Sequence, residues 1–409
     1  MAISAQRASR AALRGIRLTL LLACAVIVAG CAATLPRNAL PESLVDEAHL
    51  RGMDDVRLWG DAPPEQIHAI VQAEMSRRST AAIERSLKRP VADFLAISGG
   101  AEDGAFGAGL LTGWTKAGTR PEFDIVTGVS AGALIAPFAF LGPRRDRELK
   151  AIFTEYGRDD ILTADVLSGI FGGPALADSA PLARLIAKYV DAKFLREIAE
   201  ERKKGRLLLI GTTNLDAQRP VLWDMGRIAM YRTPEALSLF RNVLLASASV
   251  PGVFPPVRIQ VRANGHDYDE MHVDGGVTQQ VFLAPTTLAF RDIDRVLGRH
   301  IQRRLFILRN GKITPEWQPV EDKAYITAGR SISTLIKNQG IGDLYRIYSM
   351  TARDDIAFNL ATIPGSFALT SKEPFDLRYM RALYKTGYEM GALGYHWMDA
   401  PPGLVAASR

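Results

Sequence analysis

The chain has 409 residues, of which 47% are hydrophobic and 23% are charged, a composition that is typical of globular proteins and excludes wholesale disorder. Its net charge is +6, but four arginines lie in the first 30 residues, which contain no acidic residue, so the remainder is nearly neutral. A nearly neutral protein lacks the electrostatic footprint of a nucleic-acid-binding protein, and we expect no nucleic-acid partner.

The N-terminus predicts an export signal that ends at a lipid anchor. The four arginines precede an apolar run over residues 18–28, which is shorter than the ~20 residues that a membrane-spanning helix needs. The letters VAGC follow, ending at Cys31, and they resemble a bacterial lipobox, whose cysteine becomes the lipidated first residue after cleavage. We expect residues 1–30 to be a lipoprotein signal peptide; an ordinary signal peptide or an uncleaved anchor is the alternative.

The expected location follows from the same motif. Ala32 after the cysteine resembles lipoproteins that are sent to the outer membrane, so we expect a protein anchored in the bacterial cell envelope, on the periplasmic face of that membrane. The other cysteine, Cys24, lies inside the signal, so the mature chain would keep one acylated cysteine. A disulfide and a cysteine-ligated metal site are then excluded, and a hydrophobic core must supply the stability.

Residues 31–90 are expected to form a tether that leads into an N-terminal helix. The stretch after the cysteine is polar and contains several prolines. Ile67, Ile70, Val71 and Met75 then recur at helical spacing.

Short apolar runs alternate with helical patterns across residues 91–311. The expected strands are Asp93–Ser98, Phe123–Gly128, Arg206–Thr213 and Arg303–Gly311. The expected helices between them are Asp103–Ala117, Ala180–Lys188 and Pro234–Ala246. Near-continuous apolar strands are typical of a sheet that is buried on both faces, so the pattern predicts a three-layer α/β domain with a mostly parallel central sheet.

Residues 312–409 are expected to form a helical C-terminal extension. Three segments read as helices, Lys323–Asn338, Leu344–Asn359 and Asp376–Leu393. The last one carries an apolar stripe that includes Tyr379 and Tyr384, and such a stripe is more often packed on a domain than inserted in a membrane.

A candidate nucleophile follows the second expected strand. Gly128-Val-Ser-Ala-Gly132 places Ser130 at a strand-to-helix turn, and glycines two residues before and after a serine let strand and helix pass closely in a nucleophile elbow. The alternative is that Ser130 is only a small residue at an ordinary turn between strand and helix. In a parallel sheet this position lies at the carboxyl ends of the strands, where ligands bind.

A second glycine-rich turn follows the first expected strand. Gly99, Gly100 and Ala101 can direct backbone N–H groups toward a developing oxyanion. A plain tight turn or a phosphate-binding loop is the alternative, but neither nucleotide-binding glycine pattern occurs in its proper order, so we expect no nucleotide.

The base that would activate Ser130 has two kinds of candidate. A histidine-based hydrolase would use His300 or His396, and neither follows a strand in a glycine-rich loop. Asp274 stands before Gly275 and Gly276, which let the backbone bend away and present the carboxylate, so it can act as the base directly. Asp-Gly is also a common turn, and the motif alone leaves the choice open.

Taken together, these motifs resemble the patatin-like phospholipases, which have a glycine-rich oxyanion loop, then G-x-S-x-G, then D-G-[GA]. The resemblance covers residues 91–311 and implies a patatin-like sandwich, with Ser130 as nucleophile and Asp274 as base of a Ser-Asp dyad. It further implies a lipid or fatty acyl ester substrate and no metal or cofactor. The segment SASVPGVFPPV, residues 247–257, also resembles the family there.

One position departs from the family pattern. The usual oxyanion loop is Gly-Gly-Gly-x-Arg-Gly, whereas here Ala101 replaces the third glycine and Asp103 occupies the basic position. A carboxylate there would oppose the oxyanion unless Asp103 points away and caps the following helix. This departure keeps open an alternative function, an inactive patatin-like lipoprotein that binds lipid or a partner.

Overall fold

The computed structural model describes residues 37–77, 79–164, 175 and 177–404. The expected signal peptide and Cys31 lie outside these residues.

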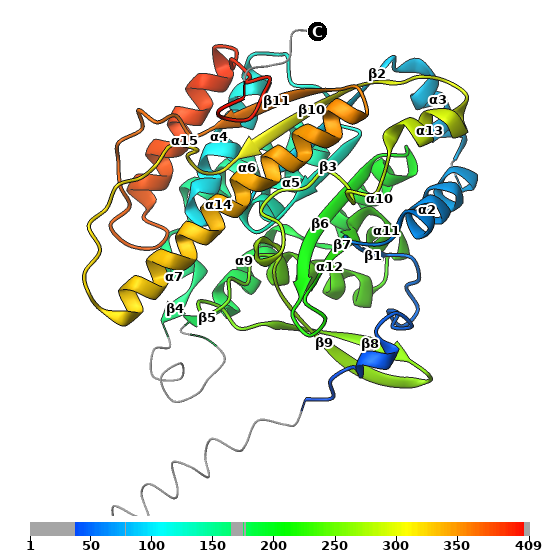
Figure 1. Ribbon diagram of the computed structural model, residues 1–409, viewed down its shortest axis with the longest axis horizontal. Helices are drawn as coiled ribbons and strands as arrows, with labels where there is room; N and C mark the ends of the chain where they lie inside the picture. The colour runs from blue at the N-terminus through cyan, green and yellow to red at the C-terminus, as the bar shows by residue number, and fades with distance from the viewer. Residues whose placement is uncertain (1–36, 78, 165–174, 176, 405–409) are drawn as a thin grey trace, which may run out of the picture.

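A nine-stranded sheet forms the centre of the described part of the chain (Figure 1). Its parallel strands are, in spatial order, β6 (Leu207–Asn214), β3 (Ile125–Gly128), β2 (Val91–Ile97), β10 (Gln302–Arg309) and β11 (Ile356–Thr362). Two antiparallel strands extend the sheet beyond β6: β7 (Arg219–Asp224) pairs with β6, and β1 (Arg57–Trp59) pairs with β7. The strands β8 (Val257–Ala263) and β9 (His266–Asp274) form an antiparallel hairpin, and β9 pairs with β6. The mostly parallel sheet confirms the predicted fold class, and all four predicted strands are present.

Helices cover both faces of the sheet, which makes three layers. One face carries α4 (Gly104–Lys116), α5 (Ala131–Leu141), α6 (Asp146–Thr154), α7 (Arg158–Ile161), α9 (Ala180–Tyr189), α10 (Ala192–Lys203), α11 (Met225–Tyr231), α12 (Pro234–Ser247) and α15 (Leu377–Ala392). The other carries α2 (Pro64–Ser76), α13 (Phe290–Leu297) and α14 (Ala324–Arg353). Successive side chains of β2 alternate between the two cores, with Leu95 and Ile97 in one and Phe94 and Ala96 in the other.

The remaining elements are short or lie at the margins. They are α3 (Thr80–Lys88), the small pair β4 (Thr163–Ala164) and β5 (Ala177–Asp178), and the 3₁₀ turns η1 (Glu42–Leu44), η2 (Ala101–Asp103), η3 (Pro143–Arg145) and η4 (Gly275–Val277).

The C-terminal segment differs from its prediction. Two separate helices were expected over residues 323–338 and 344–359, but one helix, α14, runs from Ala324 to Arg353. Residues 356–362 are not helical; they form β11, which pairs in parallel with β10 in the central sheet. The expectation of a purely helical extension is therefore wrong.

The segment expected to be a tether also differs from its prediction. It contributes β1 to the opposite edge of the sheet, and the expected helix α2 follows β1 in the chain. The boundaries between domains stay predictions.

Glycines let α15 pack directly on α4, as the apolar stripe predicted. A Cβ atom at Gly109 or Gly113 of α4 would collide with the carbonyl groups of Tyr384 or Tyr388 in α15. The Tyr384 hydroxyl, in turn, lies 2.6 Å from the Thr112 hydroxyl. The backbones can approach this closely only because those positions carry no side chain.

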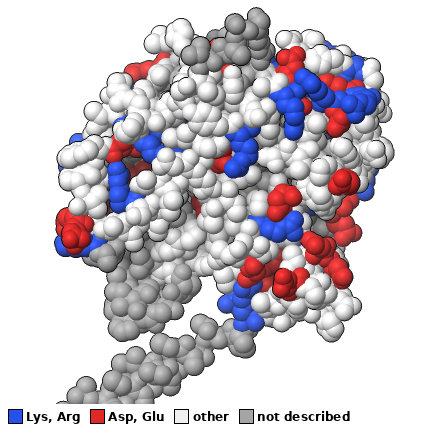
Figure 2. All heavy atoms as spheres, in the orientation of Figure 1, with Lys and Arg blue, Asp and Glu red and all other residues white. Residues whose placement is uncertain are grey.

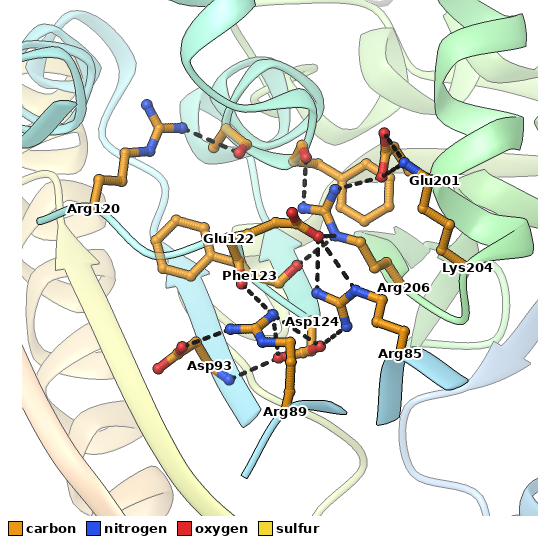
Figure 3. Close-up of polar contacts among 12 residues, drawn as sticks. Arg85, Arg89, Asp93, Arg120, Glu122, Phe123, Asp124, Glu201, Lys204 and Arg206 are labelled. Carbon is orange, nitrogen blue, oxygen red and sulfur yellow. Dashed lines mark hydrogen bonds and ion pairs between the residues drawn. The ribbon is translucent and has the colours of Figure 1, made fainter. Parts of the chain in front are cut away.

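Ion pairs gather at the amino ends of the parallel strands, opposite the end that carries Ser130. Figure 3 shows Arg206 of the turn before β6 among Arg85, Glu122 and Glu201, with the Arg89 and Asp93 pair beside them. On the face in Figure 2, charged side chains stand in small groups of both signs, as expected for a nearly neutral protein. In the described residues, no helix is both long and apolar enough to cross a bilayer.

Candidate active site

Ser130 occupies a sharp elbow between β3 and α5. Its backbone has φ 55° and ψ −125°. Residues other than glycine rarely adopt this conformation, and where they do it is typically at functional sites. A Cβ atom at Gly128 would collide with the Gly132 carbonyl, and one at Gly132 with the Ile97 carbonyl of β2. The glycines of the motif thus permit the close passage that an elbow requires, and the serine side chain lies at the carboxyl ends of β2 and β3.

Asp274 ends β9 and faces the same point. Its Oδ1 accepts a hydrogen bond from the Gly276 N–H (2.7 Å), and its backbone N–H donates to the Ser249 carbonyl (2.9 Å). The buried Oδ2 has no hydrogen-bond partner of regular geometry among the described residues. The Ser130 hydroxyl is close enough to lower the pKa of this carboxyl, so the two groups face each other across a loose contact. Catalytic hydrogen bonds are often long without substrate and tighten when it binds.

Burial dominates the acidity of Asp274. It raises the pKa of the carboxyl from 3.8 to about 6, while the loose contact with the Ser130 hydroxyl and the hydrogen bond from Gly276 oppose that rise. A base with a pKa just below neutrality is ionised at pH 7 and still accepts a proton readily.

The glycine-rich loop adjoins Ser130, but its three residues differ in what they offer. A Cβ atom at Gly99 would lie 3.7 Å from Ser130 Oγ, so the loop passes directly beside the hydroxyl. The Gly99 N–H is not free, because it donates to the Gln280 carbonyl (3.0 Å), and the prediction of Gly99 as an oxyanion donor is wrong. The N–H groups of Gly100 and Ala101 have no acceptor within the described ranges.

Close packing against β10 imposes the backbone of this loop. Gly100 has φ 154° and Ala101 has φ 48°, and a side chain at Gly100 would collide with the Asn310 carbonyl. The Asn310 side chain also accepts from the Gly107 N–H (3.1 Å) and donates to the Ser98 carbonyl (2.9 Å). Asn310 is not among the sequence-based candidates; its place near the end of the fourth predicted strand was the available signal.

Asp103 is held by a residue far along the chain. The Tyr379 hydroxyl of α15 donates to Asp103 Oδ1 (2.5 Å), and the Asp103 side chain does not cap α4, contrary to one expectation. Burial raises the pKa of Asp103 to about 7; the Tyr379 hydrogen bond opposes the rise and the neighbouring Glu102 adds to it. Near pH 7 the carboxyl is therefore partly neutral, which weakens its opposition to a developing oxyanion.

The histidines do not serve Ser130. His300 is exposed and lies 3.1 Å from an Asp294 carboxylate oxygen, and His396 is exposed beside Trp397. His272, two residues before Asp274, is buried, but both its ring nitrogens are engaged, by Thr212 (3.0 Å) and by Glu270 (3.0 Å).

Residues 247–257, the segment SASVPGVFPPV, brace both Ser130 and Asp274. Ser247 Oγ accepts from the Ser130 N–H (3.1 Å) and donates to the Gly211 carbonyl (2.6 Å). Ser249 binds the Asp274 backbone from the same segment. One short segment thus sets the separation of Ser130 and Asp274, a role that its sequence did not reveal.

An apolar cavity of about 60 Å³ opens beside Ser130. Its walls include Leu134, Phe153, Leu185, Val250, Phe254 and Met380. Such walls suit a hydrocarbon chain, of which a cavity of this volume takes only a short part. No group of His, Cys, Asp and Glu side chains suited to a metal ion occurs in the part of the chain that the structure describes.

Comparisons with known proteins give one family match and one listed structural match. No curated protein sequence matches the chain. Among solved structures, VipD from Legionella pneumophila matches with a TM-score of 0.35 and 12% identity, over 74% of this chain and 66% of that one. Residues 95–286, which contain the loop, the elbow and Asp274, match the family model of patatin-like phospholipases. Residues 95–286 are therefore a patatin-like phospholipase domain, and the family is one of lipid acyl hydrolases.

Proposed function

We propose that the protein is a serine hydrolase that cleaves acyl esters of lipids with a Ser130–Asp274 dyad. The observation that carries the proposal is the buried, unpartnered Oδ2 of Asp274 beside a serine on a strained elbow. A buried carboxylate oxygen without a partner is unfavourable, and the proton of the serine hydroxyl satisfies it as the reaction begins.

The first half of the reaction forms an acyl-enzyme. Asp274 Oδ2 takes the proton of Ser130 as Oγ attacks the ester carbonyl carbon, and negative charge develops on the carbonyl oxygen. The N–H groups of Gly100 and Ala101 stabilise that charge. The carbon–oxygen bond to the alcohol then breaks, and Asp274 returns the proton to the leaving alkoxide.

The second half regenerates the enzyme. Water gives a proton to Asp274 and attacks the acyl carbonyl, the bond to Oγ breaks, and Ser130 recovers the proton. The acyl chain begins in the apolar cavity beside Leu134 and Leu185. The sequence of steps uses this chain's own groups and needs no metal or cofactor.

A covalent serine probe tests the assignment. A fluorophosphonate should label the wild type and the control Ser371→Ala, which removes a different serine, but not Ser130→Ala. Full esterase activity in Ser130→Ala would show that another residue is the nucleophile. The rival function, an inactive lipid-binding protein, is excluded if purified protein turns over an ester panel and Asp274→Asn abolishes that turnover.

We also propose that Cys31 carries a lipid anchor that places the enzyme on the periplasmic face of the outer membrane. The support is the lipobox-like sequence before Cys31 and the arginine-rich apolar leader. Cys31→Ser should abolish incorporation of labelled fatty acid and move the protein to the soluble fraction. Unchanged association with membranes would contradict this anchor.

A further inference from the structure

Arg309 is a buried cation without a counter-ion. It ends β10, and only 4% of the residue is exposed. Its Nε has no hydrogen-bond partner, and no ion pair engages its guanidinium among the described residues. Gly340 of α14 packs directly against this guanidinium, where a Cβ atom would collide with it. A charged group held in this way is unfavourable unless an anion is supplied from outside the fold.

The two carboxylates whose charges act on Arg309, Asp343 and Asp103, are committed elsewhere. Asp343 accepts from the Gln280 backbone N–H (2.7 Å) and from Arg346 (2.9 Å), and Asp103 accepts from Tyr379. Burial lowers the pKa of Arg309, and these two carboxylates oppose the shift without overcoming it.

Arg309 opens into a cleft of about 550 Å³ that carries an excess of positive charge. We call it the cationic cleft, and its cationic residues and loop glycines are Gly99, Gly100, Arg309, Lys312, Arg330 and Lys337. The acidic residues on its wall are Asp103 and Glu316, and Glu316 is shared by Lys337 (3.0 Å) and Lys312 (3.5 Å). The long helix α14, which crosses in front of β10 in Figure 1, provides Arg330 and Lys337.

The cationic cleft and the apolar cavity lie on the two sides of one loop. Gly99 and Gly100 line the cleft, while the next residue, Ala101, lines the apolar cavity together with Ser130. An ester bond held at Ser130 thus has hydrocarbon walls on one side and cationic side chains on the other. This arrangement suits a molecule whose acyl chain and anionic group flank the same ester.

We propose that the cationic cleft is a subsite for the phosphoryl group of the lipid substrate, with Arg309 as its main ligand. The inference rests on the proposed function, and it adds a residue that selects phosphate-bearing lipids over neutral ones. The planar guanidinium pairs with phosphate through charge-assisted hydrogen bonds. Lys312 and Arg330 add positive charge at the rim of the cleft.

The test compares two lipids with the same acyl esters, dihexanoyl phosphatidylcholine and dihexanoylglycerol. Arg309→Met should lower the ratio of their kcat/KM values by roughly 10- to 100-fold, the range expected for a lost hydrogen bond to a charged group. Lys385→Met, which removes an exposed charge on α15, should leave both values unchanged. If Arg309→Met fails to fold, Lys312→Met should lower the ratio about three- to fivefold. A ratio that stays constant in the folded variants overturns the proposal.

Binding to protein that cannot turn over separates this proposal from the proposed function. In the Ser130→Ala background, Arg309→Met should weaken the Kd for the phosphatidylcholine by at least 10-fold and spare the diacylglycerol. Equal weakening for both lipids would make Arg309 a structural residue only. Inorganic phosphate that binds as tightly as the phosphatidylcholine would assign the cleft to free phosphate instead. If the wild type is inert and the serine probe does not label it, the dyad fails, and these Kd values still decide on the cleft.

Discussion

Burial raises the pKa of two acidic side chains, Asp274 beside Ser130 and Asp103 in the glycine-rich loop, and the two groups have different roles. Asp274 has a pKa of about 6 and faces the serine, whereas Asp103 has a pKa of about 7 and is held by Tyr379. The first group must be ionised to accept a proton, and the second favours an oxyanion only when it is neutral. At the scale of single residues, pH should therefore act on the rate in two opposite directions.

Asp274→Asn should lower kcat by about 10²- to 10⁴-fold, because the amide cannot accept the serine proton. In the wild type, kcat/KM should rise as pH passes through about 6, since Asp274 then loses its proton. A pH–rate profile of the wild type measures that rise. A profile that is flat between pH 5 and 7 would remove Asp274 as the base.

The same substitution should stabilise the fold at alkaline pH. The folded pKa of Asp274 lies above the ordinary 3.8, so its contribution to stability is complete below pH 3.8 and is lost as pH rises through about 6. At pH 8, Asp274→Asn should then raise the free energy of unfolding by roughly 1 to 3 kcal/mol. Urea unfolding at pH 5 and pH 8 checks this, and a destabilised variant at pH 8 would contradict the burial argument.

Asp103→Asn should increase activity selectively above pH 7. The wild-type carboxyl ionises through about pH 7 and then opposes the negative charge that develops near Gly100. The ratio of variant to wild-type kcat/KM should grow between pH 6 and 9. A ratio that does not change with pH would show that the Asp103 charge does not reach the reacting oxygen.

At the scale of elements, helix contacts control the loop beside Ser130. The helix α15 reaches Asp103 through Tyr379, and the preceding Phe375 N–H donates to Glu102 (3.1 Å). The position of α15 depends in turn on the glycines that it meets in α4. A change at that interface should therefore affect stability and, through η2, the oxyanion loop.

Gly113→Ala should destabilise the protein by roughly 2 to 3 kcal/mol, because the added methyl group overlaps the Tyr388 carbonyl of α15. The matched control is Gly342→Ala in α14, where a methyl group has open space. The control should be neutral or up to about 1 kcal/mol more stable, since alanine favours helix. Urea unfolding compares the two; equal effects would mean that α4 and α15 tolerate separation.

The two ends of the sheet have different roles at the scale of the whole molecule. The carboxyl ends of β2 and β3 carry the loop and the elbow, while their amino ends carry the ion pairs of Figure 3. In that network the Arg206 guanidinium donates to the Phe123 carbonyl (2.7 Å), the Phe140 carbonyl (2.6 Å) and Glu201 (2.9 Å). This buried arginine, which lies just before β6, therefore joins the loop before β3 to the helices α5 and α10.

Arg206→Met should cost about 3 to 5 kcal/mol, because it leaves buried acceptors without a donor. The control Arg295→Met removes an arginine from an exposed pair with Asp292 and should change stability by less than about 1 kcal/mol. Thermal unfolding measures both. The folded fraction of Arg206→Met should keep wild-type kcat, and a selective loss of kcat would place this network in the catalytic machinery.

Local patterns were sufficient to predict the core strands, the order of Ser130 and Asp274, and the glycines of the elbow. Each is a local requirement: a strand buried on both faces must be apolar, and an elbow needs glycines at fixed spacing. Distant contacts were needed for the rest. Tyr379 meets Asp103 across 276 positions, and the partner of the Gly99 N–H comes from Gln280.

The long helix α14 also shows that contacts between distant residues decided what the local sequence pattern did not. Gly340 and Gly342 favour a break in the sequence, yet the helix continues, because Gly340 packs on Arg309 and Asp343 binds backbone N–H groups at Gln280 and Val281. A glycine's cost to a helix is local and small, whereas these contacts exist only once β10 and α14 are side by side. Residue patterns therefore identified Ser130 and Asp274 as candidates, and packing decided which groups around them are free to act.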